Sequence, residues 1–377
     1  MWIPEDELDR RQFIRSAALL TAIGGLAACG RAAHATGPVP VTPPATRDGI
    51  RFVAANRGLL YGAAVGAANL ADQDLLGAHV RESGLVVPMG LGSWSVTRPS
   101  PTTYDFTRLD AIWDWAQSVS LPMRGIHLVW HQNLPAWFAA TVTPSNALQV
   151  MQDHINTVMA RYRGKLQSWS PVNEAIFPPD GRADGLRVSP WLQLLGPGYV
   201  AQAFRFAAAA DPSAFLIYNE FGIEDDTPAA DLKRAQTLQL LESLVGAGVP
   251  IHGLGMQAHL DAANRTNPGK LRAFMDAVAA LGLKVLVTEL DVKDRSLPAD
   301  IPTRDAAVAA KYHEFLQPVV AHPAVTTIIT FGLSDRNTWL TRQAPRSDGL
   351  PVRPLPLDQN LQRKPAWTRI VDALNGT

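Results

Sequence analysis

The stretch Val285-Leu286-Val287-Thr288-Glu289-Leu290-Asp291-Val292 is an apolar run that carries a glutamate near its end. A second stretch, Trp169-Ser170-Pro171-Val172-Asn173-Glu174-Ala175, repeats this arrangement. Glutamate is rarely buried unless it is paired, so a carboxylate that ends a buried strand is unexpected as core packing. It suits the mouth of a parallel barrel, where catalytic groups gather. The chain between Glu174 and Glu289 has room for about three βα units, which fits strands four and seven of an eightfold barrel.

The same two residue types also predict a chemistry. Glycoside hydrolysis requires two carboxyl groups at one sugar, one to protonate the leaving oxygen and one to attack or to position water. Glu174 and Glu289 are therefore a candidate catalytic pair.

Short apolar strands alternate with Ala-rich amphipathic segments along the chain, which is the pattern of βα units. We expect strands at Leu60-Ala64, Leu85-Pro88, Met123-Val129, Leu166-Val172, Phe215-Asn219, Gly253-Gln257, Lys284-Leu290 and Thr326-Phe331. We expect helices at Ala147-Tyr162, Tyr199-Ala210, Asp231-Ala247, Lys270-Leu281 and Thr303-Val320. These elements predict an α/β fold, a (β/α)8 TIM barrel. A doubly wound open sheet is the alternative, but no Gly-rich phosphate loop follows the first strand.

The N-terminus has the features of an export signal. Asp9-Arg10-Arg11-Gln12-Phe13-Ile14 places paired arginines before the apolar stretch 17–28, which is too short to span a bilayer. Leu26-Ala27-Ala28-Cys29 then resembles a lipoprotein box, whose cysteine is acylated after cleavage. A signal cleaved near Ala33-His34-Ala35 is the alternative reading. We expect export by the twin-arginine route and a lipid anchor on Cys29 that holds the protein at the periplasmic or cell-surface side of a membrane.

Three regions follow from this reading. Residues 1–29 are the export signal with the lipobox, and residues 30–50 are a Pro/Ala-rich tether. Residues 51–377 remain for one catalytic barrel, which is a comfortable length for this fold. Cys29 is the only cysteine of the chain, so the barrel has no disulfide.

The charge and composition of the chain limit the classes of partner that it could bind. The formal net charge is +0, which argues against nucleic acid as a partner. Ten tryptophans offer flat faces for sugar rings, although many must belong to the core. The histidines show no ligand spacing, so neither a metal nor another cofactor is expected. We expect a monomer that binds a polysaccharide and meets a membrane only through its lipid.

Five blocks of sequence occur in order over nearly the whole chain: Arg124-Gly125 with Leu128-Val129-Trp130-His131, Trp169 to Ala175, Gly253-Leu254-Gly255-Met256-Gln257-Ala258-His259-Leu260, Val287 to Val292, and Gly332-Leu333-Ser334-Asp335 with Trp339. Together they resemble the motif series of family 10 glycoside hydrolases, the retaining endo-β-1,4-xylanases. The resemblance implies a (β/α)8 barrel and a double displacement, with Glu174 as the acid/base and Glu289 as the nucleophile.

Further residues acquire expected roles from their positions. Asn173 would bind the sugar's 2-hydroxyl, unless it is only a turn former at a strand end. His259 and Asp291 would orient the nucleophile. Because Gln257 and His259 are two residues apart on one expected strand, they should share a face, with Gln257 beside Glu289. We expect the walls of the site to contain Trp130, His131, Trp339 and, on the acceptor side, Phe221.

The chain also departs from the family pattern. Where the family has a Glu-Asn pair and a Lys before a Trp, this chain has Pro88-Met89-Gly90-Leu91-Gly92-Ser93-Trp94. The family's His after Arg-Gly is Ile126 here, and the one-residue shift should turn His127 to the opposite face of its strand unless the strand slips. Phe331 stands where a Trp is usual, and Gly222 where an Asn is usual. Linear xylan is therefore expected to be a poorer substrate than a substituted or glucan-type chain.

The sequence thus predicts a retaining endo-β-1,4-glycosidase that acts on a xylan-like chain or on a substituted polysaccharide such as an exopolysaccharide. The alternative is a weak or inactive barrel that binds polysaccharide as a lipoprotein. A binding protein has no need for two costly close carboxylates, which favours the enzyme.

Overall fold

The computed structural model describes residues 47–377, so the paired arginines and Cys29 lie outside the described residues. Its strands are β1 (Leu60–Val65), β2 (Val86–Pro88), β3 (Ser168–Asn173), β4 (Phe215–Glu220), β5 (Gly253–Met256), β6 (His259–Asp261), β7 (Lys284–Lys293) and β8 (Val325–Thr330). Seven of them form one parallel sheet in the order β2-β1-β8-β7-β5-β4-β3, and the short β6 pairs with β7.

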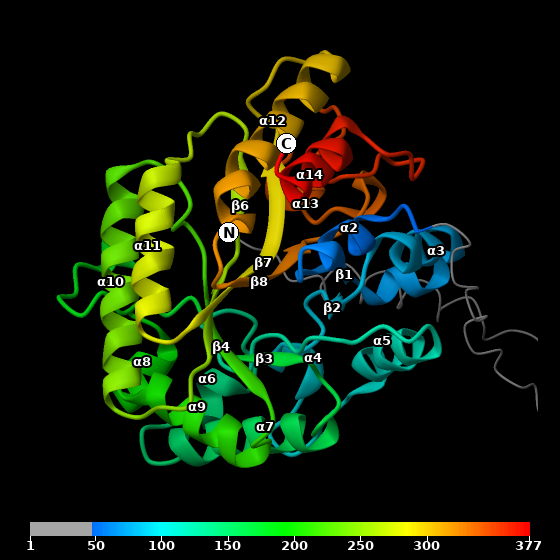
Figure 1. Cartoon of the computed structure of the whole chain (residues 1–377). Coiled ribbons are helices and arrows are strands. Elements are labelled where there is room, and N and C mark those ends of the chain that lie inside the picture. Colours follow the sequence, from blue (N-terminus) through cyan, green and yellow to red (C-terminus); the bar gives the residue numbers. More distant parts are fainter. Residues whose placement is uncertain (1–46) are drawn as a thin grey trace, which may run out of the picture. The chain divides into compact units, whose positions relative to one another are not determined.

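The α-helices are α2 (Ile50–Asn56), α3 (Gln73–Glu82), α4 (Trp94–Thr97), α5 (Thr107–Ser118), α6 (Phe138–Thr141), α7 (Ala147–Arg161), α8 (Pro190–Leu195), α9 (Tyr199–Ala210), α10 (Pro228–Gly246), α11 (Pro268–Ala280), α12 (Ile301–Val320), α13 (Leu340–Gln343) and α14 (Pro365–Asn375). The 3-10 turns are η1 (Ala67–Ala71), η2 (Pro178–Asp180) and η3 (Asp335–Asn337). In the outer layer α10 contacts α11, α11 contacts α12, α12 contacts α14, and α14 contacts α2 (Figure 1). Helix α2 begins at the last residue of the predicted tether.

The predicted third strand, Met123-Val129, is irregular and closes the barrel. Its first residue bridges to Val86 of β2 and its last to Val172 of β3, so each edge of the sheet gains a partner. When this segment is counted as the eighth strand, the sheet closes into the predicted (β/α)8 barrel.

A one-residue bulge explains why Met123-Val129 is not a regular strand. The amide of Gly125 donates to Ser168 O at 2.8 Å and that of Leu128 to Ser170 O at 3.0 Å. Three residues of the segment therefore span two residues of β3. An extra residue in one strand reverses the alternation of side chains beyond it.

The apolar sequences of the strands explain why the strands form the buried central layer. In β7 every residue from Val285 to Val292 is buried, which requires helices on the outside and side chains on the inside of the barrel. The start of a helix is also determined by residues next to it in the sequence. The Thr227 side chain accepts from the amide of Ala230 at 3.2 Å ahead of α10, a cap that stabilises a helix by about 1 kcal/mol.

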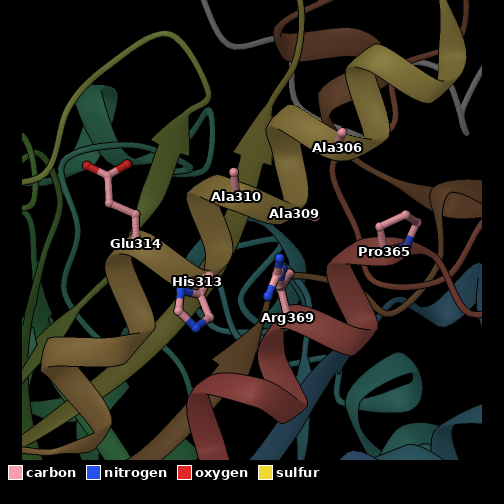
Figure 2. Close-up of a pocket in the computed structure, with 7 residues that line it drawn as sticks. All are labelled: Ala306, Ala309, Ala310, His313, Glu314, Pro365 and Arg369. Carbon is pink, nitrogen blue, oxygen red and sulfur yellow. The ribbon is translucent and has the colours of Figure 1, made fainter. Parts of the chain in front are cut away.

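One pocket of the described chain lies on the outside of the barrel, between α12 and α14 (Figure 2). Three alanines and Pro365 form part of its wall, and His313, Glu314 and Arg369 line the rest. None of these residues belongs to a strand end, so the pocket is separate from the candidate catalytic residues. In the part of the chain from residue 47 onward, no helix has the length and apolarity needed to cross a membrane.

Candidate active site

One candidate carboxylate lies just beyond the end of a barrel strand, and the other lies within a strand. Glu174 follows β3 directly, and Glu289 lies in the second half of β7. Both are buried, with 9% and 7% of the residue surface exposed. Buried carboxylates need hydrogen-bond partners, and three amide side chains supply them.

These amides join the two carboxylates in one network. Asn173 donates to Glu174 Oε1 at 3.1 Å, and Gln257 donates to the same oxygen at 3.1 Å. Asn219 donates to Glu289 Oε1 at 2.8 Å. The Oδ1 of Asn173 accepts from both Asn219 (2.9 Å) and Gln257 (3.2 Å), so every amide in the set is held by another.

The opposite side of Glu289 is held by a histidine. His259 Nε2 lies 3.3 Å from Glu289 Oε2, and its Nδ1 lies 3.0 Å from Asp291 Oδ1. Trp339 donates from its indole nitrogen to the other Asp291 oxygen at 2.6 Å. The chain Trp339–Asp291–His259–Glu289 fixes the nucleophile candidate in one orientation.

The surroundings of Glu289 keep it charged. Burial alone would raise its pKa, but the His259 hydrogen bond, the charges of His127 and His259, and the Asn219 amide outweigh burial and lower the pKa to about 2. Glu289 is therefore a carboxylate throughout the neutral and mildly acidic range.

The surroundings of Glu174 act in the other direction. Burial and then the negative charge of Glu220 raise the pKa of Glu174, with a smaller contribution from Glu289. Hydrogen bonds from Gln257 and Trp130 oppose the rise without cancelling it. Two carboxyl groups whose pKa values are pushed apart are suited to the roles of acid and nucleophile.

Three of the predicted wall residues lie on the Glu174 side, whereas Trp339 lies on the Glu289 side. His131 Nδ1 is 3.9 Å from Glu174 Oε2, and its ring packs edge-on to Trp130 at 5.8 Å. Phe221 is partly exposed, and the ammonium of Lys233 lies 3.5 Å from the centre of its ring. The eight predicted neighbours of the two glutamates thus gather at one end of the barrel.

Gln257 lies beside Glu289 as predicted, but only through its backbone, and the shared strand face predicted for Gln257 and His259 is wrong. The Gln257 side chain binds Glu174, and only its backbone oxygen meets Glu289, by accepting from the Glu289 amide at 3.0 Å. Strand β5 ends before Gln257, and Ala258 has a left-handed φ of 62°, so Gln257 and His259 do not share one strand face. The turn at Ala258 sends the two side chains to different carboxylates.

His127 faces the site, which is the outcome expected if its strand slips by one residue. Its Nε2 lies 3.6 Å from Glu289 Oε1, inside the site. The bulge before Leu128 supplies the extra residue that compensates for the one-residue shift in sequence. Ile126 instead joins an apolar cluster in the barrel interior.

Comparison with known proteins agrees with this geometry. The model of Glycosyl hydrolase family 10 matches residues 49–373. A β-1,4-xylanase of Dictyoglomus thermophilum is 34% identical over 319 residues, which cover 82% of this chain and 87% of the relative. This chain belongs to glycosyl hydrolase family 10.

Solved structures of the family are similar throughout the barrel. Xylanase 10B of Thermotoga maritima superposes with a TM-score of 0.79 at 28% identity, covering 87% of this chain and 98% of its own. Xylanase XynB of Paenibacillus barcinonensis, solved with a conduramine derivative, gives a TM-score of 0.76 at 29% identity, covering 86% and 98%. The protein is thus a glycoside hydrolase on a (β/α)8 barrel.

This family 10 hydrolase has an apolar side to its barrel mouth. Met89 and Phe331 are partly buried and pack against a cluster that contains Ile126 and Ile329. A Cβ at Gly92 would lie 2.8 Å from Ile126 Cγ1, so the loop after β2 packs closely on that side chain. At the positions where a polar clamp was expected to be missing, Met89, Leu91 and Ile126 pack in apolar clusters, whereas Ser93 keeps a hydroxyl that lies 3.4 Å from Ser95 Oγ.

Sequence reasoning missed two residues of this family 10 site. Asn219 binds Glu289, and Glu220 acts on Glu174 through its charge. Both end β4, as an Asn-Glu pair after an apolar strand, which is the signal that singled out Asn173 and Glu174. Within residues 47–377, no group of three or more His, Cys, Asp or Glu side chains is arranged to hold a metal ion.

Proposed function

We propose that this protein cleaves a β-1,4-linked, xylan-like polysaccharide internally and with retention, with Glu289 as the nucleophile and Glu174 as the acid/base. The observation that carries the proposal is the opposed pKa shift of two buried carboxyl groups in one hydrogen-bond network. A barrel that only bound sugar would pay the burial of both groups without using either.

In the first step the Glu289 carboxylate attacks the anomeric carbon, and Glu174 gives its proton to the departing glycosidic oxygen. The carbon–oxygen bond to the leaving sugar breaks as the bond to Glu289 forms. The raised pKa of Glu174 keeps the proton available, and the pKa of about 2 keeps Glu289 unprotonated.

In the second step Glu174, now a carboxylate, takes a proton from water. The water attacks the same carbon from the face that the leaving sugar vacated and releases Glu289. Two inversions give net retention. During both steps we propose that Asn173 binds the sugar's 2-hydroxyl, since it lies next to Glu174 and is held in place by Asn219 and Gln257.

The test is digestion of a substrate panel followed by proton NMR of the first products. The panel contains xylan, a cellulose-type glucan, mannan and bacterial exopolysaccharides. Internal cleavage with a β-anomer as the initial product supports the proposal. An initial α-anomer would remove the retaining mechanism, and binding without any cleavage would favour the polysaccharide-binding alternative.

We also propose that the protein works as a monomer, exported by the twin-arginine route and anchored by acylated Cys29. The support is in the sequence, where paired arginines, a short apolar stretch and a lone cysteine follow one another. An anchored hydrolase would act on polysaccharide at the cell envelope.

A further inference from the structure

The backbone at Glu174 is in an unusual conformation. Its φ is 56°, in the left-handed region that residues with a side chain rarely adopt. Such a conformation persists only where the surrounding structure holds it, and it is found disproportionately at functional sites. The turn sends the Glu174 side chain into the site immediately after β3 ends at Asn173.

Three successive residues of β4 hold this turn. The amide of Glu174 donates to Asn219 O at 3.0 Å, the amide of Ala175 to the Tyr218 hydroxyl at 2.9 Å, and the amide of Ile176 to Glu220 Oε2 at 3.1 Å. Backbone groups at the end of a strand would otherwise be buried without partners. Two of the three acceptors are side-chain atoms.

The two side chains are linked and isolated from solvent. Tyr218 and Glu220 have 0% exposure, and the Tyr218 hydroxyl donates to Glu220 Oε2. The other Glu220 oxygen accepts from the Phe221 amide at 3.0 Å and from Lys233 Nζ at 2.8 Å. Both oxygens of the buried Glu220 carboxylate therefore have hydrogen-bond donors, and Lys233 supplies the opposite charge.

We propose that Tyr218 and Glu220 form a positioning unit for Glu174, in which both fix its left-handed turn and the Glu220 carboxylate acts electrostatically on the acid. This inference rests on the proposed role of Glu174 as the acid/base. Tyr218 and Glu220 are buried outside the sugar site, and they would help to control proton transfer by Glu174.

The charges that face Glu174 support this assignment. Glu220 and Glu289 raise its pKa, after burial, and Glu220 is the larger of the two charge effects. His131 is 3.9 Å away, and burial lowers its own pKa to about 3, so it is neutral at working pH. Of the cations nearby, Arg187 donates to the Glu174 carbonyl at 3.0 Å and Lys233 pairs with Glu220.

The test compares pH profiles of kcat/KM on an unactivated oligosaccharide. The basic limb of this profile reports the loss of the Glu174 proton. Glu220→Gln removes the charge and leaves the Lys233 cation unbalanced, so the basic limb should move to lower pH by about one unit.

Tyr218→Phe removes the acceptor of the Ala175 amide but keeps the charge. It should lower kcat on poor leaving groups about tenfold, with little loss on activated aryl glycosides and little shift of the limb.

Glu82→Gln is the matched control. Glu82, on α3, is also a fully buried carboxylate paired with a cation, and it accepts from the Ile50 amide (3.0 Å), Arg363 (3.0 Å) and the Trp367 indole (2.9 Å). These partners do not belong to the active site, so the substitution should cost stability but leave the basic limb in place. A folded Glu220→Gln variant with an unshifted limb would overturn the charge role. If Glu220→Gln does not fold, a Tyr218→Phe loss that is equal on activated and poor substrates would overturn the positioning role. If Glu174→Ala keeps the wild-type basic limb, the proposed function fails first, and this inference with it.

Discussion

His259 lies between two carboxylates, with its Nδ1 3.0 Å from Asp291 Oδ1 and its Nε2 3.3 Å from Glu289 Oε2. Burial would lower the pKa of His259, but Asp291 and then Glu289 outweigh burial and raise it to about 10. The ring is therefore an imidazolium at neutral pH and donates through both nitrogens. Its hydrogen bond to Glu289, together with its own charge and that of His127, lowers the pKa of Glu289 against the effect of burial.

Replacing the His259 charge should move the acid limb of the pH profile. His259→Gln keeps a neutral donor but removes the positive charge, so the pKa of Glu289 should rise from about 2, and kcat/KM should begin to fall at higher pH as pH is lowered. Asn219→Ala, which removes only a neutral donor, should shift the limb less. Equal shifts in the two variants would mean that hydrogen bonding, and not charge, keeps Glu289 ionised.

Removing the nucleophile should abolish turnover. Glu289→Ala is expected to lose several orders of magnitude in kcat, because the covalent intermediate can no longer form. Initial rates on polysaccharide, with circular dichroism to verify folding, measure the effect. Wild-type activity in this variant would show that Glu289 is not the nucleophile.

Removing the acid should have an effect that depends on the leaving group. Glu174→Ala should slow polysaccharide cleavage by about a hundredfold or more, and activated aryl glycosides far less, because good leaving groups need no proton. Added azide should partly restore turnover and give the glycosyl azide of retained configuration. An azide product of inverted configuration would contradict the double displacement.

The apolar mouth of the barrel should disfavour linear xylan. Met89, Ile126 and Phe331 offer no hydrogen bond to sugar hydroxyls, and each missing neutral contact costs about 0.5 to 1.5 kcal/mol. The protein from Gly30 onward should therefore show lower kcat/KM on linear xylan than on a substituted or glucan-type β-1,4 chain assayed at equal concentration. Preferential hydrolysis of linear xylan would show that other residues, such as His127, replace the clamp.

The predicted lipid anchor makes Cys29 decisive for localisation. In the native host the wild-type protein should fractionate with membranes, and Cys29→Ala should release the protein or leave it unprocessed. Immunoblots of membrane and soluble fractions measure both. A wild-type protein found wholly in the soluble periplasmic fraction would contradict the lipid anchor, and only the prediction of export would remain.

The sequence by itself determined the barrel and its two carboxylates. The strand ends at Glu174 and Glu289 were readable because burying an apolar run and ending it with a charge are local properties of the chain. Helix starts were readable less exactly, since α10 begins at Pro228, where Thr227 caps it, three residues before the expected start at Asp231.

The tertiary structure decided which groups meet. Nothing local in the sequence reveals the bulge that turns His127 toward Glu289, or the left-handed turn at Ala258 that sends Gln257 to Glu174. Both depend on the register with a neighbouring strand far away in the chain, and a one-residue change of register reverses the face of a side chain. The charge of Glu220 on Glu174 likewise exists only because β4 packs beside β3, which is why pairing and burial, and not residue type alone, set the chemistry of the site.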